Sequence, residues 1–311
     1  MRLTPIKHIK IKKDIKVKDL AKQFSNAGFG ARKLGLACEI FKSMTADKDC
    51  KVFFGLAGAM IPAGMRNIIA DMLKDNLIDI FVTTGANITH DIIESLGHRH
   101  YVGTENANDS LLNKQGIDRI FNVFMKDSVY KDLENFVMKL KNYFLNYKGK
   151  IFSIREFLYH VGKNINDKNS FVAICARKNI PLFCPAISDC GFGQMVWTHL
   201  TQDKIITVDT FLDLREISEL VWNAKRVGVF YIGGGVPKNF IQQATQFSEK
   251  HEKGASYGIQ ITTDRPEPGG SSGAPLKEGI SWGKLKPKAS HVTLYCDATI
   301  ALPIIYASVK T

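Results

Sequence analysis

The sequence predicts an α/β fold, a single domain built on a doubly wound, mostly parallel sheet with helices on both faces. Three observations predict it. Short, continuously apolar runs alternate with amphipathic stretches along the 311 residues. Strands without a polar face are typical of parallel sheets that are covered on both sides. No linker rich in proline, glycine or serine separates two domains.

The composition is that of a folded protein, with 45% hydrophobic, 10% aromatic and 23% charged residues. It excludes a disordered chain. No apolar run reaches the roughly 18 to 20 residues of a membrane helix. Lysines interrupt the apolar residues of the basic N-terminus, so no secretory signal forms there. We therefore expect a soluble, cytoplasmic protein with no membrane partner.

The formal net charge is +12, from 42 Lys and Arg against 30 Asp and Glu, and such an excess can attract nucleic acid. The lysines are spread along the chain without a nucleic-acid-binding motif, which favours a solvated basic surface and no nucleic-acid partner. None of the six cysteines forms a C-x-x-C pair, so we expect buried, reduced thiols. His98 and His100 lack a second cluster of ligands, and we expect no metal.

The first half of the chain begins with a basic arm at residues 1–24. A buried strand is expected over residues 51–58, and a second strand with its loop over 77–87. A helix follows each, the first at 66–75 and the second ending at Gly97. Residues 103–115 are irregular. A strand over residues 119–125 precedes a long helix at 130–147, and Ser153 with Glu156 has the spacing of a capping box.

The second half continues the alternation of strands and helices. Strands are expected over residues 180–187, 204–209, 226–235, 257–264 and 291–298. Helices are expected over residues 211–224, over 237–247 and at the C-terminus. Residues 265–279 are too rich in Pro, Gly and Ser for an element and too long for a simple connector, so we expect a functional loop there.

Small or polar residues follow three strands, at the edge where a doubly wound sheet places its ligand. They are residues 83–87, the glycines at 233–235 and Asp297. Small residues let the backbone approach a phosphate, and a helix N-terminus offers free N–H groups. Neither glycine cluster has the G-x-G-x-x-G spacing, so each could be only a turn, and Asp297 only a helix cap. Together the three would suit a dinucleotide.

Lys284 follows the long loop, two residues after Trp282. An apolar neighbourhood lowers the pKa of a lysine and frees its amine to form an imine. An exposed lysine that happens to follow a tryptophan is the competing interpretation. Asp189, at a strand end, is open to both a ligand and a turn interpretation.

Six sequence blocks resemble the deoxyhypusine synthase family, in family order from about residue 25 to the C-terminus. They are FFGLAGAMIPAGMR, IDIFVTTGANITHD, IPLFCPAISDCGFGQM, VFYIGGGVPKN, SSGAPLKEGISWGKL and VTLYCDATIALPII. The resemblance implies a Rossmann-like fold, bound NAD and a homotetramer whose active sites lie between subunits. It also implies transfer of a 4-aminobutyl group from the polyamine spermidine through an enzyme-lysine imine, with release of diaminopropane and no net redox change.

The resemblance further implies roles for residues of this sequence. The matching catalytic lysine is Lys284. Glu278 matches an acid that pairs with a polyamine ammonium, and Trp282 matches the wall of the amine pocket; a buried polycation needs such counter-charge. The matching NAD contacts are Thr84, Asp189, Gly234, Gly235, Thr263, Asp297 and Ala298. The arm at residues 1–24 then precedes a catalytic domain at residues 25–311.

Four positions depart from the pattern of the family. Gln194 and Ser271 stand where the family has two further amine-binding acids, Asn239 where it has a histidine, and His90 where it has a glutamate near the NAD ribose. We expect Gln194, Ser271 and Asn239 to contact the substrate. Glu267, in the long loop, could replace one lost acid.

These departures predict an altered acceptor. We expect a small diamine such as putrescine, as in homospermidine synthase-like enzymes. One alternative is a true deoxyhypusine synthase, which modifies a lysine of the hypusine-carrying translation factor. Another is an inactive homologue that binds NAD or polyamine. An ordinary NAD dehydrogenase is the remaining class, and it would accumulate NADH.

Overall fold

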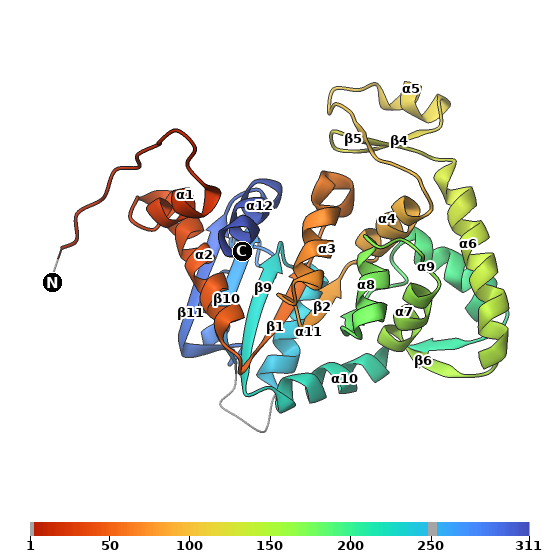
Figure 1. Ribbon diagram of the computed structural model, residues 1–311. Coiled ribbons are helices and arrows are strands. Elements are labelled where there is room, and N and C mark those ends of the chain that lie inside the picture. Colours follow the sequence, from red (N-terminus) through yellow and green to blue (C-terminus); the bar gives the residue numbers. More distant parts are fainter. Residues whose placement is uncertain (1–2, 248–253, 311) are drawn as a thin grey trace. The chain divides into compact units, whose positions relative to one another are not determined.

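The computed structural model describes residues 3–247 and 254–310. Figure 1 shows their helices and strands. The chain divides into two units: the first comprises Met1–Ala57, Asn76–Val82 and Arg215–Thr311, and the second comprises Gly58–Asp75 and Thr83–Leu214. The boundaries predicted from the sequence, an arm at residues 1–24 and one domain at 25–311, stay a prediction.

The first unit is built on a sheet with the strand order β11-β10-β9-β1-β2. Strand β9 pairs in parallel with β1 and with β10, and β10 pairs in parallel with β11. The strands are β1 (Cys50–Leu56), β2 (Ile80–Thr83, its last residue in the second unit), β9 (Arg226–Ile232), β10 (Ala255–Thr262) and β11 (Leu285–Tyr295). The predicted doubly wound α/β architecture is confirmed here.

Helices cover both faces of this sheet because alternate side chains of its strands point to opposite sides. On one face Phe230 of β9 packs edge to face on Phe41 of α2 (Phe29–Ala46), with ring centroids 5.2 Å apart. On the other face the neighbouring Tyr231 and Ile241 of α11 (Gly235–Gln246) close over Gly55 of β1, where an added Cβ would lie 2.8 Å from the Tyr231 ring. Burying each such large apolar side chain stabilises the fold by about 1.5–3 kcal/mol.

The predicted N-terminal arm is only partly extended. Its second half forms α1 (Val17–Phe24), which packs against α2 and against the C-terminal helix α12 (Ala298–Val309). Before α1 the backbone is exposed and has no regular structure from residue 3 onward, although the Lys10 N–H donates to Gln23 Oε1 at 2.7 Å. No helix of the described residues is long and apolar enough to cross a bilayer.

The second unit is mainly helical and carries two small sheets. Its longer helices are α3 (Arg66–Lys74), α4 (Gly85–Ser95), α6 (Val129–Phe144), α7 (Ile154–Lys163) and α8 (Phe171–Lys178). Strands β3 (Tyr101–Val102), β5 (Val123–Lys126) and β4 (Ile117–Ile120) form an antiparallel sheet, and β6 (Ile151–Ser153) pairs in parallel with β8 (Thr207–Asp209). The shorter elements are the π-helices η1 (Ile61–Met65) and η3 (Trp197–Thr201), the 3-10 helix η2 (Leu145–Tyr147), β7 (Leu182–Phe183), α5 (Asp109–Lys114) and α9 (Gly191–Val196). Helix α10 (Thr210–Asn223) runs from the second unit into the first.

Several sequence predictions about elements were wrong. Residues 119–125 form a hairpin rather than one strand, because Phe121 has a positive φ of 53° and turns the chain between β4 and β5. Residues 103–115 include α5, which Asn108 caps by accepting from the Leu111 N–H. The predicted strands at 180–187 and 204–209 shorten to β7 and β8. Helices α2 and α8 were missed, since their apolar residues give no clear amphipathic stripe.

A buried guanidinium joins three helices of the second unit. Arg66, only 9% exposed, bonds through Nε to Asp91 Oδ1 at 2.8 Å and through Nη2 to Asp167 Oδ2 at 2.8 Å. Asp91, which is fully buried, also accepts from Ser170 Oγ at 2.6 Å at the start of α8. Burial is the largest influence on the Asp91 carboxyl and raises its pKa, although the Arg66 cation opposes it. The ion pair therefore holds α3, α4 and the start of α8 in one arrangement.

Replacing Arg66 with Met should lower the free energy of unfolding by about 3–5 kcal/mol, because Asp91 would keep a buried charge without its cation. Urea unfolding measured by circular dichroism would report the change. The matched control is Arg215→Met, which removes an exposed ion pair with Glu219 and should cost less than about 1 kcal/mol. Equal losses in the two variants would contradict the role assigned to the buried pair.

Candidate active site

An open pocket of about 160 Å³ lies in the first unit. Its walls come from α11, from the loop that follows β10, from the 3-10 helix η4 (Leu276–Ile280) and from the turn between η4 and β11. The lining residues are Lys238, Gln242, Gly269, Ser271, Ala274, Pro275, Glu278, Gly279, Trp282 and Lys284. The structure thus brings four predicted substrate-site residues together, namely Lys284, Trp282, Glu278 and Ser271.

A tight turn presents Lys284 to this pocket. Gly283 adopts a positive φ of 71°, and the Lys284 N–H donates to Gly279 O at 2.8 Å, which closes the turn after η4. The Lys284 carbonyl accepts from the Ala255 N–H at 3.1 Å, so the start of β10 anchors the residue. The side chain is half-buried, and its Nζ lies 5.0 Å from the centroid of the Trp282 ring. This is cation–π distance, but Trp282 is itself 56% exposed and shields the amine on one side only.

Glu278 is the single carboxylate among the lining residues, and it is exposed on η4. Two lysines, Lys238 and Lys284, line the same pocket. The pocket therefore offers one anionic group to an amine ligand and carries two cationic groups of its own. Asn239, the next residue along α11, is exposed and does not line the pocket.

Lys238 is a pocket residue that the sequence analysis missed. It is only 2% exposed, and burial lowers the pKa of its amine to about 8, with Glu278 opposing and Lys284 adding to the shift. At pH 7 the ammonium is still the main form. A signal for it was available, because Lys238 lies with Ile241, Gln242 and Thr245 on the buried stripe of α11.

The carboxyl ends of β9, β10 and β11 meet at one edge of the sheet. The Gly233 N–H donates to Ile261 O at 2.7 Å, and the Cys296 N–H donates to Thr262 O at 3.1 Å, so the ladder continues past the strand ends. The residues that make these bonds are followed directly in the chain by the predicted cofactor residues, namely Gly234, Gly235, Thr263, Asp297 and Ala298. The parallel pairing thus gathers three separate sequence motifs.

The two glycines at the start of α11 serve different purposes. An added Cβ at Gly234 would lie 2.3 Å from Ser272 Cα, so only glycine lets the loop after β10 pack this closely. Gly235 has a positive φ of 54°, and an added Cβ there would meet nothing within 4 Å. A ligand can therefore approach the backbone at Gly235, where the first N–H groups of α11 are available to an anion. Asp297 caps α12, since its Oδ1 accepts from the Thr299 N–H at 2.7 Å.

The other predicted site residues belong to the second unit. Thr84 precedes α4, and its Oγ1 donates to Gly58 O at 3.0 Å. An added Cβ at Gly85 would lie 2.6 Å from Cys190 Sγ and 3.5 Å from Asp189 O, so the turn after β2 packs directly on Asp189 and Cys190. Thr84 and Asp189 therefore lie on contacting loops. Gln194 is exposed on α9, beyond Cys190.

The family model of deoxyhypusine synthase matches residues 19–309. The chain belongs to the deoxyhypusine synthase family. Two archaeal relatives carry the name "Probable deoxyhypusine synthase 1". The one from Methanosarcina acetivorans is 42% identical over 99% of this chain and 95% of its own length. The one from Archaeoglobus fulgidus is 44% identical over 96% and 95%. Members of the deoxyhypusine synthase family are NAD-dependent aminobutyl transferases.

Two further relatives are more distant. A "Deoxyhypusine synthase-like protein" from Chlorobaculum tepidum is 36% identical over 97% of this chain and 88% of its own length. The crystal structure of a deoxyhypusine synthase candidate from Entamoeba histolytica has a TM-score of 0.67 at 20% identity, covering 97% of this chain and 96% of its own. That second likeness concerns the fold alone.

His90, for which the resemblance predicts a departure from the family, lies in a chain of hydrogen bonds in the second unit. Its Nδ1 is 2.9 Å from His100 Nε2, and His100 Nδ1 is 2.8 Å from Glu94 Oε1. His90 is 8% exposed, and burial, assisted by His100, lowers the pKa of its imidazole to about 4. The ring is therefore neutral at pH 7. No group of three or more His, Cys, Asp or Glu side chains among the described residues could hold a metal ion.

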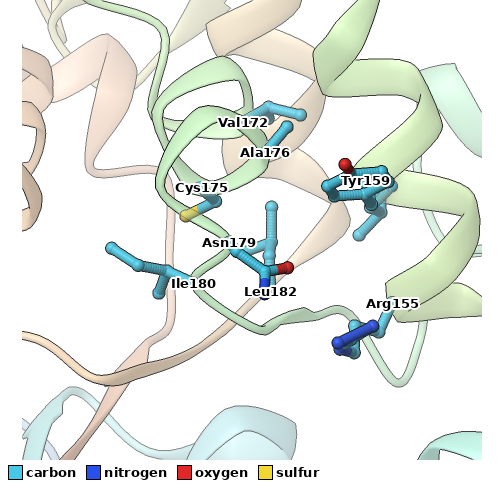
Figure 2. A pocket seen from close by; sticks show the side chains of 9 residues that line it. Arg155, Tyr159, Val172, Cys175, Ala176, Asn179, Ile180 and Leu182 are labelled. Carbon is cyan, nitrogen blue, oxygen red and sulfur yellow. The ribbon is translucent and has the colours of Figure 1, made fainter.

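A second cavity, in the second unit, is too small for an amine substrate. Figure 2 shows it between α7 and α8, with Tyr159 facing Val172 and Ala176. Its volume is about 10 Å³, which is about the room that a single water molecule needs. Cys175 lines it as well, and burial raises the pKa of this thiol well above its usual range. We assign this cavity no part in the chemistry.

Acid should destabilise the protein through His90. Because the pKa in the folded chain lies below its usual value of 6.5, the unfolded chain alone binds this proton between pH 6.5 and about 4. Above pH 6.5, His90 does not lower the free energy of unfolding. As the pH falls from 6.5 to about 4, proton binding to His90 in the unfolded chain lowers this free energy by about 3 kcal/mol.

Urea unfolding at pH 7 and pH 4.5 should show a smaller acid loss in His90→Gln than in the unaltered chain. His8→Gln, which changes an exposed histidine, is the control and should behave like the unaltered chain. The assignment would be wrong if His90→Gln kept the full pH dependence.

Proposed function

We propose that this chain transfers the 4-aminobutyl group of spermidine to a lysine of the hypusine-carrying translation factor. The observation that carries the proposal is the single pocket in which Lys284, Trp282 and Glu278 lie together. This pocket shares α11 with the glycine turn that begins at Gly233. The names of the archaeal relatives support the protein acceptor over a small diamine.

In this proposal Lys284 is the covalent catalyst. Once the amine carbon of spermidine has lost its hydride and is an imine, the neutral Nζ adds to that carbon. The bond from the carbon to the diaminopropane nitrogen then breaks, diaminopropane leaves with the proton from Nζ, and an imine remains on the enzyme. The acceptor amine then displaces Lys284 from that carbon and forms an imine of its own. Bound NAD would supply the redox chemistry, namely a reversible hydride acceptor for the amine carbon, so the overall transfer would involve no net redox change.

Glu278 and Trp282 position the amine. The Glu278 carboxylate accepts hydrogen bonds from an ammonium of spermidine, since a charge-assisted bond is stronger than a neutral one. The Trp282 ring provides an apolar face beside the Lys284 amine, 5.0 Å from ring centroid to Nζ. Ser271 lines the same pocket, and its hydroxyl donates to Gly235 O at 3.3 Å. Asn239, which is exposed, is proposed to meet the acceptor rather than the donor. Gln194, in the second unit, stays a substrate contact predicted from the resemblance alone.

We assign NAD to the carboxyl edge of the first unit. The open backbone at Gly235 and the N-terminus of α11 suit a phosphate. The other proposed NAD contacts in this unit are Gly234, Thr263, Asp297 and Ala298. Thr84 and Asp189, which lie in the second unit, stay NAD contacts predicted from the family resemblance alone. The homotetramer, with active sites between subunits, and the cytoplasmic location stay predictions.

A small diamine is the second candidate acceptor, and one observation favours it. Glu278 is the only carboxylate that lines the pocket, and Ser271 lines it at a position where the family resemblance implies an acid. Such a pocket offers less counter-charge to a polyamine than the family pattern would, which fits a changed amine specificity.

Product analysis by mass spectrometry separates the two acceptors. Purified protein with NAD and spermidine should release diaminopropane and add one aminobutyl group to a lysine of the translation factor, when that factor is supplied. With putrescine in its place, new homospermidine would instead favour the small-diamine candidate. Diaminopropane without either product, or NADH that accumulates, would contradict both transferase readings.

Lys284→Ala should abolish the imine that borohydride traps with labelled spermidine, because no other residue is proposed to hold the aminobutyl group. The affinity for NAD, measured by calorimetry, should stay within about twofold, since the glycine turn is untouched. Lys288→Ala, an exposed lysine of β11, is the control and should trap as well as the unaltered chain. Trapping that persists in Lys284→Ala would remove this lysine from its role.

A further inference from the structure

The loop between β10 and η4 has little apolar packing of its own. Residues 263–270 are all exposed, and the loop is rich in glycine, proline and serine. Its backbone is nonetheless fixed, because its carbonyl groups bond to three buried polar side chains. These are Lys238 on α11 and Gln260 and Thr262 on β10, which are 2%, 0% and 3% exposed.

Lys238 binds the part of the loop that borders the pocket. Its Nζ donates to Ser271 O at 2.7 Å, to Ala274 O at 2.6 Å and to Gln260 Oε1 at 3.2 Å. An ammonium has three N–H donors and no acceptor, so these three oxygens satisfy it completely. Both Ser271 and Ala274 line the pocket, and Glu278 follows four residues after Ala274.

Different side chains bind the part of the loop that borders the glycine turn. Ser272 O accepts from Gln260 Nε2 at 2.9 Å and from Thr262 Oγ1 at 3.1 Å. The same residue is the one that packs on Gly234. Lys238 thus holds the pocket side of the loop, and Gln260 and Thr262 hold the glycine side. Gln260 connects the two sets, because its Oε1 accepts from Lys238 while its Nε2 donates to Ser272 O.

We infer that Lys238 is a positioning residue for amine binding, which fixes the backbone from Ser271 to Ala274 and with it the pocket wall that leads to Glu278. The inference rests on the proposed function. Lys238 lines the pocket only with its stem, since its three donors already have protein partners. Its pKa of about 8 leaves the ammonium as the main form at pH 7, so all three bonds are present under working conditions.

Replacing Lys238 with Met keeps the length of the stem and removes the three donors. The spermidine KM, and the spermidine Kd measured by calorimetry with NAD present, should rise about tenfold or more, as expected for lost bonds to a charged group. Amide hydrogen exchange across residues 265–279 should quicken about tenfold. The NAD Kd should change less than about threefold, because Gln260 and Thr262 still hold Ser272.

Three variants control this experiment. Lys238→Arg keeps a cation with several donors and should restore most of the spermidine affinity; it also serves if the Met variant does not fold. Thr262→Val removes a buried bond to Ser272 and should quicken exchange without raising the spermidine KM more than about twofold. Lys277→Met, which changes an exposed lysine of η4, should leave both quantities unaltered.

Faster exchange in Lys238→Met with an unchanged spermidine KM and Kd would overturn the inference, and so would unchanged exchange. An equal loss of NAD and spermidine affinity would also overturn it, because Lys238 would then be only a general support of the fold. If the unaltered chain transfers no aminobutyl group, the proposed function fails. Hydrogen exchange and the spermidine Kd would still decide the effect of Lys238 on the loop and the pocket.

Discussion

The parallel pairing of β9 with β1 and β10 is the constraint on which the first unit depends. The register sets Phe54 beside Phe230 and Gly228 beside Tyr257. A slip by one residue would turn every side chain of β9 to the opposite face, so Phe230 would lose its packing on α2. With the register held, the strands end at one edge. The glycine turn, Thr263 and Asp297 follow there from distant parts of the sequence.

Two buried cations show how differently the protein stabilises charge. Arg66 lies among carboxylates and connects three helices, so it serves the architecture of the second unit. Lys238 bonds only to neutral oxygens. Its positive charge is thus not cancelled by a direct partner, and together with Lys284 it leaves Glu278 outnumbered in the pocket. Such a pocket suits an amine ligand that binds Glu278 through the ammonium group at one of its ends. The rest of the ligand would then lie away from the two lysines.

Much of the first unit could be predicted because its signals are local. The strands near residues 51, 226, 257 and 291 are continuous apolar runs, and Lys284 with Trp282 lies in a short, specific motif. Where a signal depends on partners, prediction failed. Phe121 turns a hairpin within an apolar run, and α2 is buried on too many sides to show a stripe. The spacing of Lys238 on the buried stripe of α11 could have indicated its burial, but nothing in the sequence near it shows the carbonyl groups that surround its amine.

The sequence by itself determined the α/β class, the family and the motifs that carry the chemistry, because these depend on apolar runs and on residues close together in the chain. Only the tertiary structure decided which motifs meet. It placed Ser271, Glu278 and Lys284 around one pocket and Asn239 outside it. It also showed that the loop after β10 is held by Lys238, Gln260 and Thr262. Hydrogen bonds to backbone carbonyls leave no trace in the sequence, since every residue has a carbonyl and only folding selects which ones are used.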